Sequence, residues 1–231
     1  MGKVIEKIAV SRGHEIIAKS TRTTPVEDID FTNIDVAIEF TAPEMAVKHI
    51  KHCVNQQTPV VVGTTAWIED LPKVKSYVQE NNGALLHASN FSIGVNIFFA
   101  VNKLLARLME DHMDSYDCTI AETHHTQKID APSGTAVSLA NDILLENANL
   151  TSWLHEEEKT PEVQNDQLGV TSFRKKGVPG THVVRYNSEI DTLEIKHTAH
   201  NRMGFALGAV LAAEWLHGKT GIYTMADVIQ F

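Results

Sequence analysis

Residues 1–90 alternate short apolar runs with amphipathic helical segments, and this alternation restricts the fold more than any other feature of the sequence. The apolar runs end at Phe40, Gly63 and Ser89, and segments with helical periodicity lie between them. Strands joined by helices run parallel in one sheet, so the pattern predicts a doubly wound, Rossmann-like α/β domain. We expect helices at 3–11, 43–56 and 71–82, and strands at 14–20, 35–40, 58–65 and 84–89.

A second domain is predicted where the pattern changes, after a long helix at 94–110. Strands are expected at 117–124, 169–176, 181–188 and 191–198, and a long helix at 134–148 follows the first of them. This predicts an α+β domain with a mixed four-stranded sheet. The acidic segment 146–167 is expected to be a long surface loop with at most a short helix. Two final helices, at 202–217 and 224–229, are expected to return to the first domain.

These boundaries predict a dinucleotide-binding domain at 1–93 and 204–231, and a substrate-binding domain at 94–203. Charge argues against a nucleic-acid partner, because 29 acidic and 20 basic residues give a net charge of -9. The longest apolar stretch, 205–216, is interrupted by Glu214 and is shorter than the roughly 20 residues of a membrane span. Cys53 and Cys118 form no CxxC pair, which favours a reducing, cytoplasmic location.

A nucleotide site is predicted beyond the carboxyl ends of the parallel strands, where open α/β sheets bind ligands. The residues there combine small, hydroxyl, amide and aromatic groups: Phe40, Thr41, Gly63, Thr64, Thr65, Ser89, Asn90 and Phe91. Strand ends also require turn residues, but three such groups on one edge favour a nucleotide. The usual G-x-G-x-x-G turn is not in the sequence, and only Gly2, just before the first helix, corresponds to its last glycine.

The segment "ETHHTQKIDAPSGTA", residues 122–136, gathers proton carriers and anion-binding groups. Ser133 is placed to cap the helix that follows, and the amides of Gly134 and Thr135 would then be exposed to an anion. A capping serine alone is a common structural feature. Beside histidines and Lys128, however, it predicts a pocket for a carboxylate with a proton donor that works near neutral pH.

Two other chemistries fit this segment poorly. Adjacent residues of a strand point to opposite faces, so His124 and His125 are not expected to share one metal ion. Ser133 lies outside a G-x-S-x-G sequence, which argues against a serine hydrolase. We therefore expect no metal site.

These residues resemble the dihydrodipicolinate reductase family over nearly the whole chain. The segment 122–136 is similar to the family's E-x-H-H-x-x-K-x-D-A-P-S-G-T-A substrate motif, which is highly specific. The segments "EFTAPE", "VVGTT" and "ASNFSIGVN" resemble its cofactor-binding segments, and "HTAHNRMGFALGAV" resembles its return into the first domain. The resemblance implies NAD(P)H-dependent reduction of dihydrodipicolinate to tetrahydrodipicolinate, in diaminopimelate and lysine biosynthesis.

Carried over by position, the resemblance assigns roles to individual residues. His124 and Lys128 would be proton donors, and Lys128 would also hold a substrate carboxylate. The carboxylates would be held further by His125, Ser133, Gly134 and Thr135. The cofactor would be lined by Gly63, Thr64, Thr65, Ala88, Ser89, Asn90 and Phe91. The family also implies a homotetramer built through the sheet of the second domain.

The resemblance is incomplete at two places in the first domain. The family begins with a strand and a Gly-rich turn, so Met1-Gly2-Lys3 corresponds to the end of that turn, and we expect the chain to lack the first strand. Where many members place an acid for the ribose hydroxyls, this sequence has Ser20-Thr21-Arg22. Arg22 is suited to a 2′-phosphate, so NADPH is plausible and NADH stays open.

Three alternatives to this function stay open. Another small cyclic imine dicarboxylate is one possible substrate. A catalytically silent dicarboxylate-binding protein would result if the missing turn prevents cofactor binding. A metal-dependent hydrolase using some of the 12 histidines is the least favoured.

Overall fold

The computed structural model describes residues 1–230, apart from the side chain of Ile68. The chain divides into two compact units. Unit 1 contains Met1–Ile93 together with the chain from Met203 onward, and unit 2 contains Gly94–Arg202. Each unit has its own hydrophobic core, so each is described by itself.

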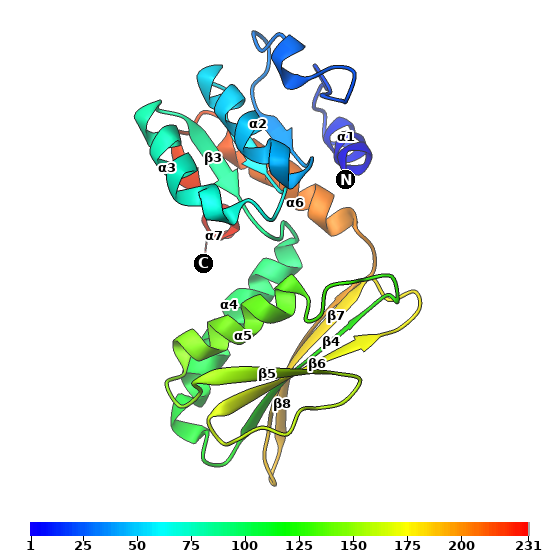
Figure 1. Ribbon diagram of the computed structural model, residues 1–231, viewed down its shortest axis with the longest axis vertical. Helices are drawn as coiled ribbons and strands as arrows, with labels where there is room; N and C mark the ends of the chain where they lie inside the picture. Colours follow the sequence, from blue (N-terminus) through cyan, green and yellow to red (C-terminus); the bar gives the residue numbers. More distant parts are fainter. Residues whose placement is uncertain (231) are drawn as a thin grey trace. The chain divides into compact units, whose positions relative to one another are not determined.

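Unit 1 is built around a parallel four-stranded sheet in the order β1-β2-β3-β9 (Figure 1). Its strands are β1 (Ala37–Glu39), β2 (Val60–Val62), β3 (Ala84–His87) and β9 (Gly221–Tyr223). Its helices are α1 (Gly2–Ser11), α2 (Pro43–Asn55), α3 (Leu71–Glu80), α6 (Met203–Leu216) and α7 (Met225–Ile229). Short 3₁₀ helices span Val26–Asp28 and Ile68–Asp70.

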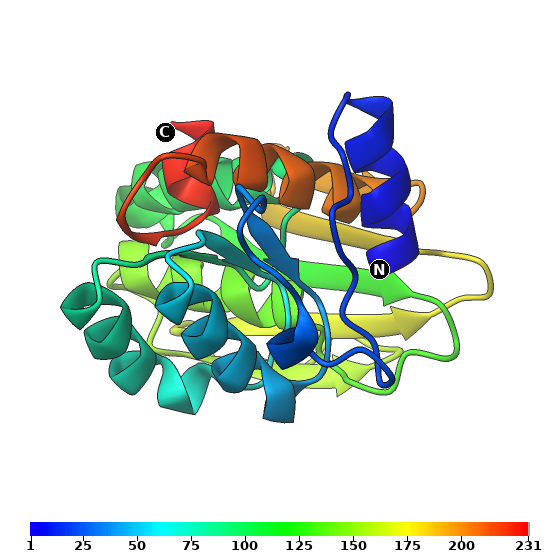
Figure 2. The same ribbon diagram turned by 90° about the horizontal axis from the view of Figure 1, so that it is seen from above.

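Helices cover both faces of this sheet, as the apolar strands predict. Val60 and Val62 pack in one core with α2 and α3, whereas Val61 packs in the other core with α1 and α6. Figure 2 shows α1 and α6, in dark blue and orange, on the side of the sheet away from α2 and α3. The alternation of side chains along β2 therefore supplies both layers.

Two details of unit 1 differ from the sequence prediction. The predicted strand 14–20 has no strand assignment, and of these residues only Ile16 is partly buried. Residues 221–223 form a fourth strand that was not predicted, because a three-residue strand between two helices carries too short a pattern. The helices at 203–216 and 225–229 belong to unit 1.

Unit 2 contains a mixed sheet in the order β5-β6-β4-β7-β8. Its elements are α4 (Ile93–Met109), a 3₁₀ helix (Glu110–His112), β4 (Asp117–His124), α5 (Gly134–Glu146), β5 (Ser152–Glu157), β6 (Gln167–Arg174), β7 (Gly180–Asn187) and β8 (Thr192–Ala199). The strands β4, β5 and β6 are parallel, and β7 and β8 form the predicted hairpin. In Figure 1, α4 and α5 lie over one face of this sheet.

The prediction of four strands is wrong, because unit 2 has five. The fifth strand, β5, lies within the segment predicted as a surface loop. It is an edge strand with only partly buried or exposed side chains, so its sequence, "SWLHEE", carries little of the apolar pattern of a strand. The outer position of β5 explains both its polarity and the wrong prediction.

No helix in the described residues is both long enough and apolar enough to cross a membrane.

Candidate active site

Three buried polar side chains form a row across neighbouring strands of unit 2. Glu122 on β4 lies opposite Ser172 on β6 and His182 on β7. Glu122 and Ser172 are fully buried, and His182 is 5% exposed. His124 lies two residues beyond Glu122 on the same strand and is also buried. Since alternate residues of a strand share a face, β4 directs both side chains toward one site.

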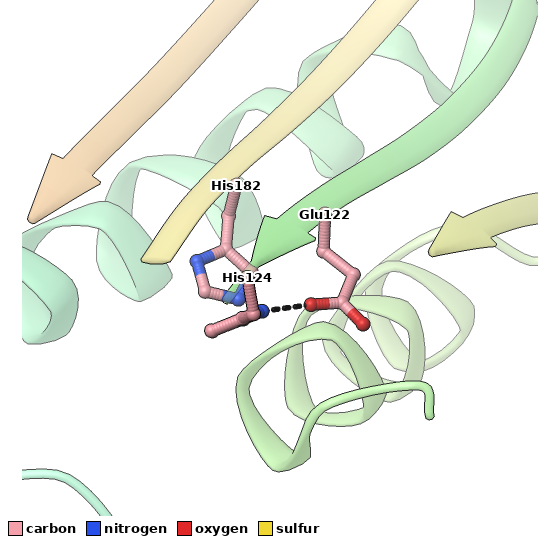
Figure 3. A group of neighbouring side chains, drawn as sticks. All are labelled: Glu122, His124 and His182. Atoms are coloured by element: carbon pink, nitrogen blue, oxygen red, sulfur yellow. Dashed lines mark hydrogen bonds and ion pairs between the residues drawn. The ribbon is translucent and has the colours of Figure 1, made fainter. Parts of the chain in front are cut away.

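The carboxylate of Glu122 is the centre of this hydrogen-bond network. Its Oε1 accepts bonds from the Ser172 hydroxyl (2.6 Å), the Ser133 backbone N–H (3.2 Å) and the Arg174 guanidinium (3.2 Å). Its Oε2 is bonded to Nδ1 of His124, as the dashed line in Figure 3 marks.

Opposing effects act on the pKa of Glu122. Burial alone would raise it, but the hydrogen bonds from His124 and Ser172 and the charge of Arg174 lower it to about 2. The carboxylate is therefore ionised, which makes it an acceptor in every bond that it forms.

Ser133 connects the network to the N-terminus of α5. Its hydroxyl accepts a hydrogen bond from the backbone N–H of Ala136 (3.2 Å), so it is the predicted N-cap of this helix. The same hydroxyl lies 3.0 Å from Nε2 of His182. Burial, aided by the nearby His124, lowers the pKa of His182 to about 3. His182 is therefore a neutral partner that holds Ser133 in place.

Lys128 lies in the connection between β4 and α5. Its ammonium contacts both carboxylate oxygens of Asp130 at 2.8 Å, and this bond lowers the pKa of Asp130. Arg174 bridges this connection to the network, because it donates to the backbone oxygen of Asp130 (2.8 Å) as well as to Glu122. The candidate residues His124, Lys128 and Ser133 thus belong to one connected set of contacts.

Glu122, His124 and His182 also offer one potential metal-ligand atom each, all within 4.8 Å of one another. The sequence predicts no metal site, on grounds that concern His124 and His125 and not this combination of residues. Two contacts oppose a cation: the guanidinium of Arg174 lies 3.2 Å from Glu122, and His182 is bonded to Ser133. A charged guanidinium at this distance repels a divalent ion, so the arrangement favours a hydrogen-bond network.

A cavity of about 290 Å³ lies at the carboxyl ends of the strands of unit 1. It is lined by Met1, Phe40, Thr41, Pro43, Gly63, Thr64 and Thr65. Five of these seven residues are predicted cofactor residues. The volume is at the lower end of the roughly 300–1,000 Å³ of small-molecule pockets, which suits one part of a dinucleotide.

Local contacts give this cavity its shape. A Cβ atom on Gly63 would lie only 2.1 Å from the ring of Phe40, so the glycine is required for the ring to occupy its place. The Phe40 ring packs in turn on Phe91, at 5.6 Å between centroids. Glu39, 5% exposed, accepts a bond from the backbone N–H of Thr41 (3.1 Å) and orders the turn after β1. The residues present fit the flat rings and hydroxyl groups of a nicotinamide nucleotide.

Other candidate residues lie outside the cavity lining. Gly2 is exposed at the start of α1, beside Met1, which does line the cavity. Arg22 is exposed and does not line it. Ala88, Ser89 and Asn90 follow β3, and the Asn90 side chain accepts a bond from the backbone of Ser92 (2.9 Å).

In unit 2, the amides of Gly134 and Thr135 lie in the first turn of α5, and His125 directly follows β4.

Four residues of the network in unit 2 were not predicted as site residues from the sequence. Glu122 could have been predicted from the sequence, because it lies two residues before His124 on a predicted strand and so shares its face. The others are Ser172, Arg174 and His182. They lie on different strands, and only the register of the sheet brings them to Glu122 and Ser133.

A Rossmann-like unit with a cavity at its strand ends, and a second unit with a buried histidine–carboxylate pair, are features found in NAD(P)H-dependent oxidoreductases. Two family models narrow this class. Residues 1–91 match the model "Dihydrodipicolinate reductase, N-terminus" and residues 94–229 match "Dihydrodipicolinate reductase, C-terminus". The chain belongs to the dihydrodipicolinate reductase family.

Individual relatives agree with this assignment. The 4-hydroxy-tetrahydrodipicolinate reductase of Christiangramia forsetii is 45% identical over 99% of this chain and 93% of its own length. The enzyme of the same name from Neisseria meningitidis serogroup B is 34% identical over 97% of this chain and 83% of its own. A solved structure of dipicolinate-bound dihydrodipicolinate reductase from Paenisporosarcina sp. TG-14 has the same fold. Its TM-score is 0.63 at 23% identity, over 82% of this chain and 71% of that one.

Proposed function

We propose that the protein converts 4-hydroxy-tetrahydrodipicolinate to tetrahydrodipicolinate, a step of diaminopimelate and lysine biosynthesis, in which the 4-hydroxyl group leaves as water and NADPH or NADH reduces the ring. The names of the relatives, at 45% and 34% identity over nearly the whole chain, support this substrate. The observation that carries the proposal is the buried Glu122–His124 pair beside the N-cap of α5. It combines a proton carrier with an anion-binding helix end, as reduction of a cyclic dicarboxylate requires.

The first turn of α5 would hold a substrate carboxylate. Ser133, Gly134 and Thr135 form the start of this helix, where backbone amides and the helix dipole favour an anion. His125 and Lys128 would add a hydrogen-bond donor and a positive charge. The Lys128–Asp130 contact holds the ammonium before substrate arrives, so a substrate carboxylate would compete with Asp130 for it.

His124 and Lys128 would supply the proton in the reaction. When bound, the nicotinamide group supplies a hydride to the unsaturated ring of the substrate. The chain's part is to place an acid near the carbon that gains the negative charge, and to fix the two carboxylates so that this carbon is correctly oriented. His124 can carry the proton on Nε2, since its other nitrogen is bonded to Glu122.

The cofactor would be held in unit 1. Phe40, Thr41, Gly63, Thr64 and Thr65 line the cavity there, and Phe91 supports the Phe40 ring. Ala88, Ser89 and Asn90 would extend this surface along the end of β3. Gly2, at the start of α1, would lie near the phosphates, and Arg22 is the candidate partner of a 2′-phosphate.

Assembly and location are further parts of the proposal. We place the protein in the cytoplasm, where its two free, buried cysteines would stay reduced. We also propose a homotetramer that forms through the sheet of unit 2. Light scattering of the purified chain tests the assembly, because a monomer would contradict it.

Calorimetric titration tests the proposed ligands. The full chain is titrated with NADPH and with NADH, each with and without pyridine-2,6-dicarboxylate as a planar substitute for the substrate. Binding of both ligands, each tightening the other, supports the reductase. Dicarboxylate binding without nucleotide binding would instead favour the catalytically silent dicarboxylate-binding protein.

A further inference from the structure

Glu122 is a fully buried ionisable group of unit 2, and the proposed reaction assigns it no proton transfer. It is fully buried, yet it stays charged, and it has hydrogen-bond partners on β4, on β6 and at the cap of α5. Burying a charge is costly unless its partners offset the cost, so such a group commonly serves a specific purpose. Its contact with a proposed proton donor indicates what that purpose is.

The bond between Glu122 and His124 determines which ring nitrogen of His124 carries a fixed hydrogen. An ionised carboxylate has no hydrogen to donate, so Nδ1 of His124 must be the donor. The hydrogen on Nδ1 is then present in both the neutral and the protonated ring. Consequently Nε2 is the nitrogen that gains and loses a proton.

The surroundings of Nε2 agree with this assignment. Gly180 on β7 has no side chain beside Nε2. A Cβ atom at this position would lie only 3.0 Å from that nitrogen. Nδ1 of His124 forms a hydrogen bond, whereas Nε2 forms none with the residues that the structure describes. His182 contacts the His124 ring edge to face, at 5.1 Å between centroids, and bonds to Ser133 instead. The absence of a side chain at Gly180 on β7 therefore leaves room for a ligand at Nε2.

We propose that Glu122 is a positioning residue: its carboxylate fixes His124 with a hydrogen on Nδ1, so that Nε2 delivers the proton to the substrate. Ser172, Arg174 and the Ser133 backbone hold the other oxygen and so fix the carboxylate itself. The inference rests on the proposed function, because the proton acceptor is the substrate of that reaction. The inference has a structural half, the tautomer of His124, and a catalytic half, the delivery of the proton. The structural half can be tested without any enzymatic turnover.

Nuclear magnetic resonance of the full chain with ¹⁵N-labelled histidine tests the structural half. In the wild type, neutral His124 should carry its hydrogen on Nδ1, and its signal is identified by its loss in His124→Gln. In Glu122→Gln the amide oxygen should stay with the donors Ser172, Arg174 and the Ser133 N–H, so the amide NH2 faces Nδ1 and the hydrogen should move to Nε2. A wild-type His124 protonated on Nε2 when neutral, or one unchanged by Glu122→Gln, would overturn the proposal.

Steady-state kinetics test the catalytic half. Glu122→Gln should lower kcat by about 10²- to 10⁴-fold, as loss of general acid–base catalysis does. The KM of the dicarboxylate substrate should change little, because the proposed carboxylate-binding residues are unchanged. Glu122→Asp keeps a carboxylate and should restore part of the rate. An unchanged kcat, or equal losses in both variants with a raised KM, would contradict a positioning role.

Controls separate this inference from the proposed function and from misfolding. Glu214→Gln makes the same chemical change in unit 1, where Glu214 pairs with Arg12, and should leave kcat unchanged. Binding of pyridine-2,6-dicarboxylate by Glu122→Gln reports on its fold. If the wild type itself shows no turnover, the proposed function fails, and the histidine spectrum still decides the tautomer. If Glu122→Gln does not fold, the wild-type spectrum and Glu122→Asp decide the proposal.

Discussion

Gly180 lies on β7 beside Nε2 of His124, and it is the residue at which the smallest change should affect the proposed chemistry. In Gly180→Ala, the added methyl group would lie about 3.0 Å from Nε2, closer than a normal contact, so His124 must shift. A misplaced proton donor costs on the order of 10- to 100-fold in rate. We expect kcat to fall by this amount in steady-state assays, with dicarboxylate binding retained. Unchanged kinetics would show that Nε2 is not the functional nitrogen.

Gly63 in unit 1 is likewise a glycine that leaves room for the ring of a proposed site residue. A Cβ atom there would overlap the Phe40 ring at 2.1 Å, so Gly63→Ala must move the ring that lines the cavity. We expect weaker binding of NADPH and NADH in calorimetric titrations. Pyridine-2,6-dicarboxylate, titrated alone, should bind as it does to the wild type, because its proposed residues belong to unit 2. A nucleotide affinity equal to that of the wild type would remove this cavity from the proposal.

At the scale of single residues, the proposed donor groups were predictable from the sequence, but their hydrogen-bond partners were not. His124, Lys128 and Ser133 stand within one short segment, so the sequence alone places them near one another. His182 reaches Ser133 across 49 positions of the chain, which only the pairing of β4 with β7 explains. Local spacing cannot express such a contact, because the register of a sheet depends on the whole fold.

Ser133 ties a single helix, α5, to the sheet beneath it. Ser133→Ala removes the N-cap bond to Ala136 and leaves Nε2 of His182 without its partner. Loss of a cap costs about 1 kcal/mol, and an unpaired buried polar group about 1–3 kcal/mol more. Denaturant unfolding should show a loss of about 2–4 kcal/mol, and Ser133→Thr, which keeps a hydroxyl group, should lose less. Equal losses in the two variants would contradict the capping role.

The row of buried polar groups across β6, β4 and β7 gives the sheet of unit 2 a specific pH dependence. The pKa of Glu122 is about 2 when folded and about 4.5 when exposed in an unfolded chain. Folding lowers this pKa, so the stabilisation is present above pH 4.5 and is lost as the pH falls toward 2. The shift corresponds to a contribution on the order of 3 kcal/mol to the free energy of unfolding.

The variant Glu122→Gln isolates this effect. Glu214 in unit 1 also has a pKa lowered to about 2, but it is present in both proteins and cancels from the difference. The difference in the free energy of unfolding should therefore be largest at neutral pH and shrink below pH 4.5. Chemical denaturation at several pH values measures it. A constant difference from neutral to acid pH would show that Glu122 is not the charged partner.

At the scale of elements, regular patterns were predictable and short or polar ones were not. The strand β4 was predicted with its observed bounds, 117–124, because its buried side chains alternate regularly. The edge strand β5 carries His155, Glu156 and Glu157, whose polarity suggests a loop. The segment 14–20 contains apolar residues but gains no sheet partner, which shows that a strand-like pattern requires a neighbouring strand.

For the whole molecule, the fold class followed from periodicity, whereas the family followed from a motif. Alternating strands and helices distinguish a Rossmann-like unit from other folds, but many chemistries share that fold. The segment 122–136 specified the substrate class, and family models and relatives over nearly the whole chain agree with it. The hydrogen bonds that would tune the reaction required the structure, because Glu122, Ser172 and Arg174 meet only in three dimensions.

The most direct test of the account is the rate at which the full chain oxidises NADPH, and separately NADH, in the presence of 4-hydroxy-tetrahydrodipicolinate, compared with the rate of His124→Gln. We predict saturable, substrate-dependent oxidation by the wild type. The variant should retain dicarboxylate binding and lose about 10²- to 10⁴-fold in kcat. A wild-type chain that binds substrate and cofactor but oxidises neither nucleotide, or a variant as active as the wild type, would contradict the account.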